Sequence, residues 1–170
     1  MPESDLQAYC ILCRTGAEQE VKQKVESFMT GIEAIVPSRV IEEKKDRQWR
    51  KVERPLLPGY VFLYSASDLP HDLIWKIGHL YRILQYERGL RGLQGEDRDY
   101  AFWLYRHQGQ IKPSTVLEEG GTIRVIDGPL LDATGKITRL DKRHRRAWVQ
   151  FTFDGQTRTV SLSASCVEQM

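Results

Sequence analysis

The sequence has few cysteines and no long hydrophobic run. Its 170 residues include three cysteines, Cys10, Cys13 and Cys166. Three cysteines are too few for a disulfide framework, and an odd number cannot all pair. No apolar run approaches the ~18 residues that a membrane-spanning helix needs. The first residues, MPESDLQ, lack the basic and apolar regions of a signal peptide. We therefore expect a cytoplasmic protein with no membrane partner.

The sequence also lacks a strong net charge and a recognisable catalytic constellation. The formal net charge is +2, and the four histidines are scattered without a nucleophile or metal-site pattern. Cys10 and Cys13 have the spacing of a redox or zinc motif. They lie in an expected strand, however, where residues three apart point to opposite faces. We expect structural cysteines, no metal, no cofactor and no enzymatic activity.

The residues that are present are typical of a folded protein, with 41% hydrophobic and 28% charged side chains. Residues 7–13 predict a strand. A helix is expected after it, with Thr15 as N-cap and Glu18 three residues later, the pattern of a capping box. The helix is expected to end at Gly31. Its apolar face is expected to comprise Val21, Val25 and Phe28.

The remaining pattern up to residue 108 predicts more strands than helices. IEAIVPSRVIEE predicts an extended segment with an edge position or a bend at its proline. The basic segment KKDRQWRKVER predicts an exposed β-hairpin or loop, and GYVFLY and LYRILQY predict strands. A short helix that ends at about Ile77 is expected after GYVFLY, and a second helix is expected over EDRDYAFWLYRH. The order predicts an α+β fold with helices on an antiparallel sheet.

The last third of the chain has a different pattern. QGQIKPSTVLEE has no clear period and is predicted to be a linker. Beyond it, short alternating segments are separated by turn residues, which predicts a small β-barrel. The expected strands are TIRVI, ATGKITRL, RAWVQFTF and TRTVSLS.

Two motifs carry a resemblance to a known family. RPLLPGYVFLY, residues 54–64, places much apolar surface at the start of a strand, as a protein-binding site does. It is similar to P-L-F-P-G-Y-[VI]-F-V of the NusG transcription elongation factors. GTIRVIDGPLLDATGKI is similar to that family's G-x-x-V-x-V-x-x-G-P-F-x-x-x-x-G-x-[VI], with Leu57 and Leu130 in place of the usual Phe. The resemblance implies an NGN domain over 1–108, a linker over 109–119 and a KOW domain, an SH3-like β-barrel, over 120–170.

The resemblance implies a monomer that binds the clamp helices of the largest catalytic RNA polymerase subunit. Such a factor suppresses pausing and termination by binding one polymerase conformation preferentially. His71 aligns with a segment that faces the opposite polymerase lobe in some members, or is a surface helix residue. Tyr60 and Phe62 could instead be core residues. The expected polymerase contacts are Leu12, Leu57, Pro58, Tyr60, Phe62 and Leu84.

Two basic clusters are candidate nucleic-acid contacts, because cations neutralise phosphates and aromatic rings stack on unpaired bases. The resemblance implies that the first lies near non-template DNA. The arginines of the second suit an RNA hairpin in the nascent transcript, although the family's barrel also binds a ribosomal protein and Rho. Both clusters could also be solvated loops. Their members are Lys44, Lys45, Arg47, Trp49, Arg50, Lys51 and Arg54, and then Lys142, Arg143, Arg145 and Arg146.

Several details favour a specialised member of the family. AYCILC replaces the usual WYV, and YCILCRTGAEQEV is similar to LoaP, an operon-specific antiterminator. One alternative is a general NusG elongation factor. Another is a KOW-type RNA-binding or ribosome-associated protein with no polymerase role. A third, RfaH-like state with a helical C-terminal domain conflicts with the strand periods and with the turn glycines Gly128, Gly135 and Gly155.

Overall fold

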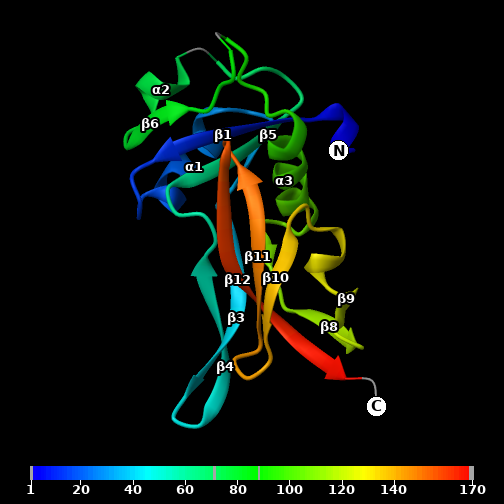
Figure 1. Ribbon diagram of the computed structural model, residues 1–170. Helices are drawn as coiled ribbons and strands as arrows, with labels where there is room; N and C mark the ends of the chain where they lie inside the picture. Colours follow the sequence, from blue (N-terminus) through cyan, green and yellow to red (C-terminus); the bar gives the residue numbers. More distant parts are fainter. Residues whose placement is uncertain (1, 71, 88, 169–170) are drawn as a thin grey trace. The chain divides into compact units, whose positions relative to one another are not determined.

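The computed structural model forms two compact units, each described here by itself (Figure 1). Among the described residues, no helix is long and apolar enough to cross a membrane. His71, a candidate residue in the sequence, lies outside the described residues. The described residues are 2–70, 72–87 and 89–168. Unit 1 comprises Met1–Pro37 and Leu57–Gly109, and unit 2 comprises Ser38–Leu56 and Gln110–Met170.

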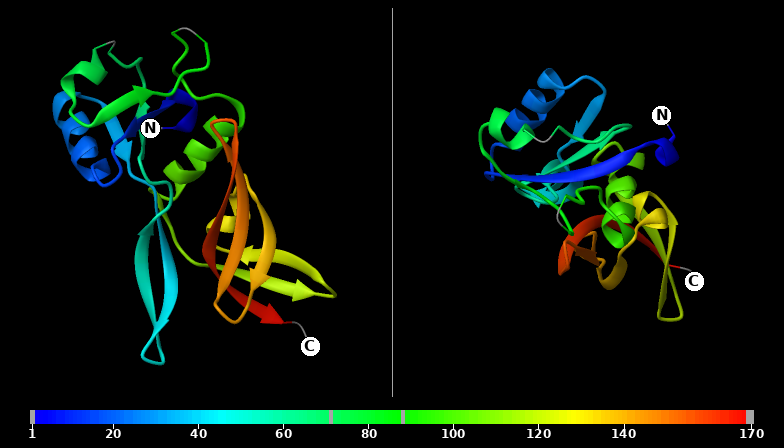
Figure 2. Two further views of the ribbon diagram at one scale, coloured as in Figure 1. Left: turned by 60° about the vertical axis from the view of Figure 1, so that its left-hand side comes forward. Right: turned by 90° about the horizontal axis from the view of Figure 1, so that it is seen from above.

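Unit 1 is built on a four-stranded antiparallel sheet in the order β2-β5-β1-β6. Helices α1 and α3 cover its opposite faces (Figure 2). The strands are β1 (Gln7–Cys13), β2 (Ile32–Ile35), β5 (Tyr60–Ser65) and β6 (Leu80–Ile83). The helices are the short 3-10 helix η1 (Glu3–Asp5), α1 (Glu18–Phe28), α2 (Leu73–Lys76) and α3 (Gly95–Arg106).

The sheet is buried on both faces. On one face, Ile11 of β1 and Val61 of β5 pack with the apolar side of α1. On the other face, the ring of Phe62 lies 5.9 Å from that of Tyr100 in α3. The Tyr64 hydroxyl donates a hydrogen bond of 2.6 Å to the carbonyl oxygen of Ala101. The sheet therefore lies between two apolar layers, one against α1 and one against α3, with β1 as an inner strand.

Helix α1 begins differently from the expected capping box. Its N-cap is Ala17 rather than Thr15, and no side chain caps it. The Glu18 carboxylate instead accepts hydrogen bonds from the backbone N–H of Gly16 at 2.5 Å and of Gly59 at 3.1 Å. This buried carboxylate therefore joins the start of α1 to the turn that precedes β5.

Two other helix details were predicted wrongly. Val21 and Val25 are buried as expected, but Phe28 is 62% exposed, and Met29 is buried in its place. The helix ends at Phe28, so the chain has already left the helical period at Met29. The helix expected up to Ile77 is only the single turn α2.

The segment IEAIVPSRVIEE forms two strands, because Val36 and Pro37 interrupt it.

Unit 2 contains the expected hairpin and a curled sheet (Figure 2). A three-stranded sheet has the order β4-β3-β7, and a five-stranded sheet has the order β10-β11-β12-β8-β9. The small sheet consists of β3 (Ser38–Lys45), β4 (Gln48–Pro55) and β7 (Gln110–Ile111). The large sheet consists of β8 (Ser114–Glu119), β9 (Thr122–Asp127), β10 (Lys136–Asp141), β11 (Arg146–Phe153) and β12 (Gln156–Glu168), with the 3-10 helix η2 (Pro129–Asp132) between β9 and β10.

The predicted C-terminal barrel is present as a curled half-barrel of strands. Strand β12 pairs antiparallel with β11 along its first part and parallel with β8 from Ala164 onward. A helical C-terminal domain is therefore not the state of this chain. The predicted linker, residues 109–119, contains β7 and β8. The boundaries of the expected polymerase-binding and KOW domains stay a prediction.

Candidate functional site

The turn before β5 is fixed by a glycine. Gly59 has a φ of +86°, and a Cβ there would lie 3.3 Å from the carbonyl oxygen of Cys13 and 3.4 Å from Oγ1 of Thr15. A left-handed φ and so close an approach both favour glycine. The backbone N–H of Cys13 donates a hydrogen bond of 2.8 Å to the carbonyl oxygen of Gly59. The turn is therefore held against the end of β1.

Three of the expected polymerase contacts lie together at the surface of unit 1. Leu12 and Tyr60 are direct partners in the β1–β5 register, so their side chains share one face of the sheet. Both are partly buried, and Pro58 is exposed. We call Leu12, Pro58 and Tyr60 the apolar mouth.

The structure leaves the other three expected contacts inside unit 1. Leu57, Phe62 and Leu84 are buried. Phe62 packs against Tyr100. Leu84 follows the end of β6, and its backbone N–H donates a hydrogen bond of 2.9 Å to the carbonyl oxygen of Cys10. These three side chains therefore belong to the interior of unit 1.

The cations of the β3–β4 hairpin are divided between its two faces. Glu42 pairs with Lys51, and Lys44 pairs with Trp49, so these four side chains share one face. The alternation of strand residues places Lys45, Arg50 and Arg54 on the opposite face. Arg54 forms an ion pair of 3.0 Å with Glu43. The turn is made by Asp46 and Arg47, both with positive φ.

The second basic cluster forms the turn between β10 and β11. The His144 ring lies 2.8 Å from the Asp141 carboxylate, and this hydrogen bond lowers the pKa of Asp141. Lys142 forms an ion pair with Glu118. Arg145 has a φ of +56°. Two of the four cations in this turn, Lys142 and Arg145, therefore already have acidic partners.

The fold of unit 2 brings the two basic clusters into contact. The Arg145 guanidinium lies 4.2 Å from the centre of the Trp49 ring and 3.2 Å from the Glu42 carboxylate. Arg146 donates a hydrogen bond of 3.1 Å to the carbonyl oxygen of Glu42. Arg39 of β3 and Arg146 each donate to the hydroxyl of Ser161 at 3.1 Å. Burial and the nearby charge of Arg146 lower the pKa of Arg39.

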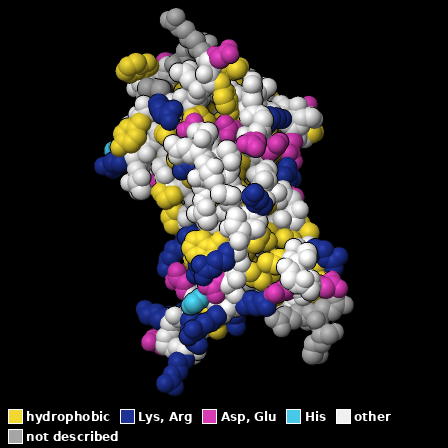
Figure 3. All heavy atoms as spheres, in the orientation of Figure 1, with side chains coloured by type: hydrophobic (Ala, Val, Ile, Leu, Met, Phe, Trp, Pro, Cys, Tyr) yellow, Lys and Arg dark blue, Asp and Glu magenta, His cyan; other side chains and the backbone are white. Residues whose placement is uncertain are grey.

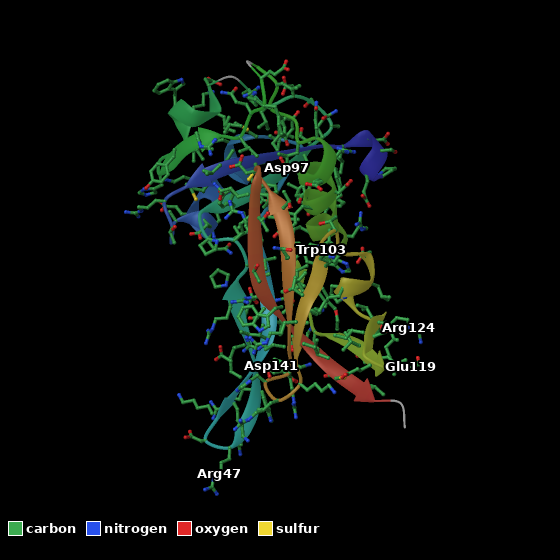
Figure 4. The ribbon with its side chains drawn as sticks, in the orientation of Figure 1. Arg47, Asp97, Trp103, Glu119, Arg124 and Asp141 are labelled. Atoms are coloured by element: carbon green, nitrogen blue, oxygen red, sulfur yellow. The ribbon has the colours of Figure 1, made fainter. Side chains whose placement is uncertain are left out.

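A pocket of about 510 Å³ lies where the hairpin and the turn meet. Lys and Arg side chains gather over the hairpin in Figure 3, and the labels of Arg47 and Asp141 mark the two turns in Figure 4. The pocket combines cations with an aromatic ring. We call it the hairpin pocket; it is lined by Glu42, Glu43, Lys44, Trp49, Arg143, His144 and Arg146.

Glu42 of the hairpin pocket and two exposed aromatic residues of unit 1 were not found from the sequence. Glu42 forms the ion pair that holds Arg145 in place. The only sequence signal for this role is that the strand alternation puts Glu42 on the same face of the hairpin as Trp49. Trp75 on α2 is 86% exposed, and Tyr81 on β6 is 66% exposed. Both lie in elements of only four residues, which are too short to show a clear apolar period in the sequence.

The cysteines have structural positions. Cys13 belongs to the core on the α1 face, whereas Cys10 pairs in register with Phe62 on the other face. Burial and the charge of Glu18 raise the pKa of the Cys13 thiol to about 11. Among the residues that the structure describes, no group of His, Cys, Asp and Glu could hold a metal ion.

We expect a thiol reagent to label Cys166 first. Cys166 is partly exposed, whereas Cys10 and Cys13 are buried, and a thiolate is the reactive form. Alkylation at pH 8 followed by peptide mass spectrometry should find Cys10 and Cys13 modified only after denaturation. The Cys166→Ser variant is the control and should show no rapid labelling. Rapid labelling of Cys13 in the native protein would contradict its structural role.

The sequence and the fold are similar to those of known proteins. The family model described as "Transcription termination factor nusG" matches residues 7–92. A relative from Helicobacter pylori, "Transcription termination/antitermination protein NusG", is 28% identical over 95% of this chain and 97% of its own length. Proteins with the same description are 30% identical over 81% of this chain, in Pseudomonas aeruginosa over 80% of their length and in Escherichia coli K12 over 77%.

A solved structure shares the fold. The structure titled "Domain interaction in Thermotoga maritima NusG" covers 95% of this chain and 96% of its own, with a TM-score of 0.51 and 21% sequence identity. This likeness agrees with an α+β unit followed by a half-barrel of strands. From the family model and the relatives that are 30% identical, the chain belongs to the NusG family of transcription termination/antitermination proteins, which are transcription factors and not enzymes.

Proposed function

We propose that this chain is a general NusG-type factor that binds RNA polymerase through the apolar mouth and reduces pausing and termination. The observation that carries the proposal is the position of Leu12, Pro58 and Tyr60 at one end of the sheet, in a chain of the NusG family. The relatives carry the description "Transcription termination/antitermination protein NusG", which names no particular operon, and this supports a general role over an operon-specific one.

The proposed partner is the pair of clamp helices in the largest catalytic subunit of the polymerase. Leu12 and Tyr60 would contact these helices, and the buried Leu57, Phe62 and Leu84 would hold the contact surface in place. The factor does no chemistry. It shifts the polymerase towards the elongating conformation only as far as it binds that conformation more tightly.

The proposed domains follow the resemblance. Residues 1–108 would form the polymerase-binding domain, residues 109–119 the connection and residues 120–170 the KOW domain. The half-barrel would be the surface for a ribosomal protein or Rho, and the two basic clusters would bind nucleic acid. The protein would act in the cytoplasm as a monomer.

We expect Tyr60→Ala to weaken binding to RNA polymerase about tenfold or more, because aromatic side chains at the centre of an interface dominate its affinity. Binding of the full chain to purified polymerase from the same organism measures this, with pause duration during transcription as a second reading. The matched control is Phe28→Ala, since Phe28 is an exposed aromatic residue on α1, across the sheet from Tyr60. Unchanged binding by Tyr60→Ala would remove the apolar mouth from the proposal.

A specialised, LoaP-like antiterminator is the second candidate. The observation that favours it is the basic turn between β10 and β11. Arg145 and Arg146 of that turn bond to the hairpin of the same unit, however, which reduces the charge it can offer to RNA. Binding should be measured at two salt concentrations, with structured leader hairpins against scrambled RNA. Selective binding would favour the specialised role, and weak, unselective binding the general one.

A further inference from the structure

We infer that the β3–β4 hairpin and the β10–β11 turn form one binding site for an unpaired nucleotide of a nucleic-acid strand. Taken from the sequence alone, the two basic clusters are separate surfaces for different nucleic acids. The inference rests on the proposed function, since a transcription complex supplies single-stranded RNA and DNA. It assigns the phosphate and the base of one nucleotide to neighbouring parts of the hairpin pocket.

The first support is that the two segments are joined around the pocket. Arg145 of the turn covers the Trp49 ring of the hairpin at 4.2 Å, and Glu42 holds the same guanidinium at 3.2 Å. Arg146 donates hydrogen bonds to the carbonyl oxygen of Glu42 and to the hydroxyl of Ser161. The contacts with Trp49 and Glu42 connect residues about a hundred positions apart in the chain. A strand that enters the hairpin pocket therefore meets both clusters at once.

The second support is the charge that remains in the hairpin pocket. Its two acidic residues are already neutralised, because Glu42 pairs with Arg145 and Glu43 pairs with Arg54. The cations of the lining, Lys44, Arg143 and Arg146, therefore remain in excess. Within the described part of the chain, the side chains of Lys44 and Arg143 form no hydrogen bond and no ion pair. An excess of positive charge favours a phosphate group.

The third support is the aromatic ring beside these cations. Trp49 lines the pocket and is only partly buried. Its cross-strand partner is Lys44, so an ammonium group and an indole ring lie on the same face of the hairpin. Stacking of a base on an aromatic side chain strengthens binding and tolerates any base. The site is thus expected to take unpaired nucleotides of any sequence in preference to a duplex.

The arrangement gives Arg145 a different role from Arg143. Arg145 is committed to Trp49 and Glu42, so it is a positioning residue that fixes the indole ring. Arg143 would contact the phosphate directly. Loss of a phosphate contact lowers the dependence of binding on salt, by about one unit of slope. Replacement of a positioning residue by one of the same charge lowers the affinity and leaves that slope unchanged.

The test measures binding of the full chain to fluorescein-labelled oligonucleotides of roughly six mixed nucleotides, close to the span of one single-strand site. The oligonucleotides compared are single-stranded RNA, single-stranded DNA and a duplex. This comparison shows whether the site takes a nucleotide of RNA or of DNA. We expect both single strands, or one of them, to bind more tightly than the duplex. Trp49→Ala should weaken that binding about tenfold. Arg143→Ala should weaken it and reduce the salt slope, whereas Arg145→Lys, which keeps the charge that neutralises Glu42, should weaken it at constant slope.

A double variant decides between one site and two. If Trp49 and Arg143 hold the same nucleotide, Trp49→Ala with Arg143→Ala should cost less than the product of the two single losses, because neighbouring contacts are not additive. The control is Arg124→Ala, which removes the same charge from β9 and should leave affinity within about twofold. In Figure 4, Arg124 lies well away from Arg47 at the tip of the hairpin.

Three results would overturn the inference. They are strictly multiplicative losses, two oligonucleotides bound per chain, and single-strand binding that Trp49→Ala leaves unchanged.

The variants also separate this inference from the proposed function. Trp49→Ala and Arg143→Ala should bind polymerase as the unchanged chain does, and Tyr60→Ala should bind oligonucleotides normally. Failure of the Tyr60 test therefore counts against the proposed function, and failure of the Trp49 test against the nucleotide site.

Discussion

The variant Gly128→Ala is expected to lose the fold of unit 2 and to keep that of unit 1. Gly128 has a φ of +98°, and a Cβ there would lie 2.6 Å from Cα of Ser114 and 2.9 Å from the carbonyl oxygen of Pro113. Both are backbone atoms at the start of β8. They cannot move aside easily, because the Ser114 hydroxyl also accepts a hydrogen bond of 3.0 Å from Leu130.

The expected loss is large compared with the stability of a small domain. A non-glycine residue at such a φ costs about 1–3 kcal/mol, and overpacking in a tight site costs about 1–3 kcal/mol more. The sum, roughly 2–6 kcal/mol, reaches the lower end of the range of about 5–15 kcal/mol for the unfolding of native proteins, and small domains lie at that end. The glycine of the DGP turn therefore serves folding rather than binding.

Hydrogen exchange of backbone amides measures the effect in each unit separately. In Gly128→Ala, the amides of β11 and β12 should lose protection while those of β1 and β5 keep it. The control is Gly121→Ala in the same unit. Gly121 has a φ of +82° with no atom within 4 Å of the added Cβ, so only backbone strain acts there. Normal protection of β11 in Gly128→Ala would mean that the close approach is not a constraint on folding.

Strands with a clear alternation could be predicted from the sequence. β1 was placed at residues 7–13, and β11 follows the alternation of Val149, Phe151 and Phe153. β8 was not found, because its pairing depends on β12, which is distant in the sequence and parallel to it. β7 has only two residues and pairs with β3. A local pattern carries no information on such partners.

The candidate site shows the same limit. The period of a strand places Tyr60 and Phe62 on one face, but it cannot say how far α3 extends over that face. Tyr100 covers Phe62, while Tyr60 remains partly exposed. The contact between Trp49 and Arg145 likewise joins residues 96 positions apart, and it exists only because the chain folds the hairpin and the half-barrel into one unit.

Phe62→Ala is expected to destabilise unit 1 by about 3–5 kcal/mol, the usual cost of removing a buried phenyl ring. The side chain is fully buried and packs on Tyr100, so its loss leaves a cavity between the sheet and α3. Urea denaturation followed by circular dichroism measures the change, and Phe62→Leu should recover most of the stability because it refills most of the volume.

Comparison with Tyr60→Ala then distinguishes a residue that stabilises unit 1 from a residue that contacts polymerase directly. Phe62→Ala should lose polymerase binding only under conditions in which unit 1 unfolds, and Phe62→Leu should bind almost normally. Tyr60→Ala should show the opposite behaviour, with weak binding and unchanged stability, because its side chain is partly exposed. If Phe62→Ala were stable and still bound polymerase poorly, the phenyl ring would have to be exposed by a rearrangement of α3 on binding. The two variants therefore test whether the apolar mouth is a preformed surface supported from below.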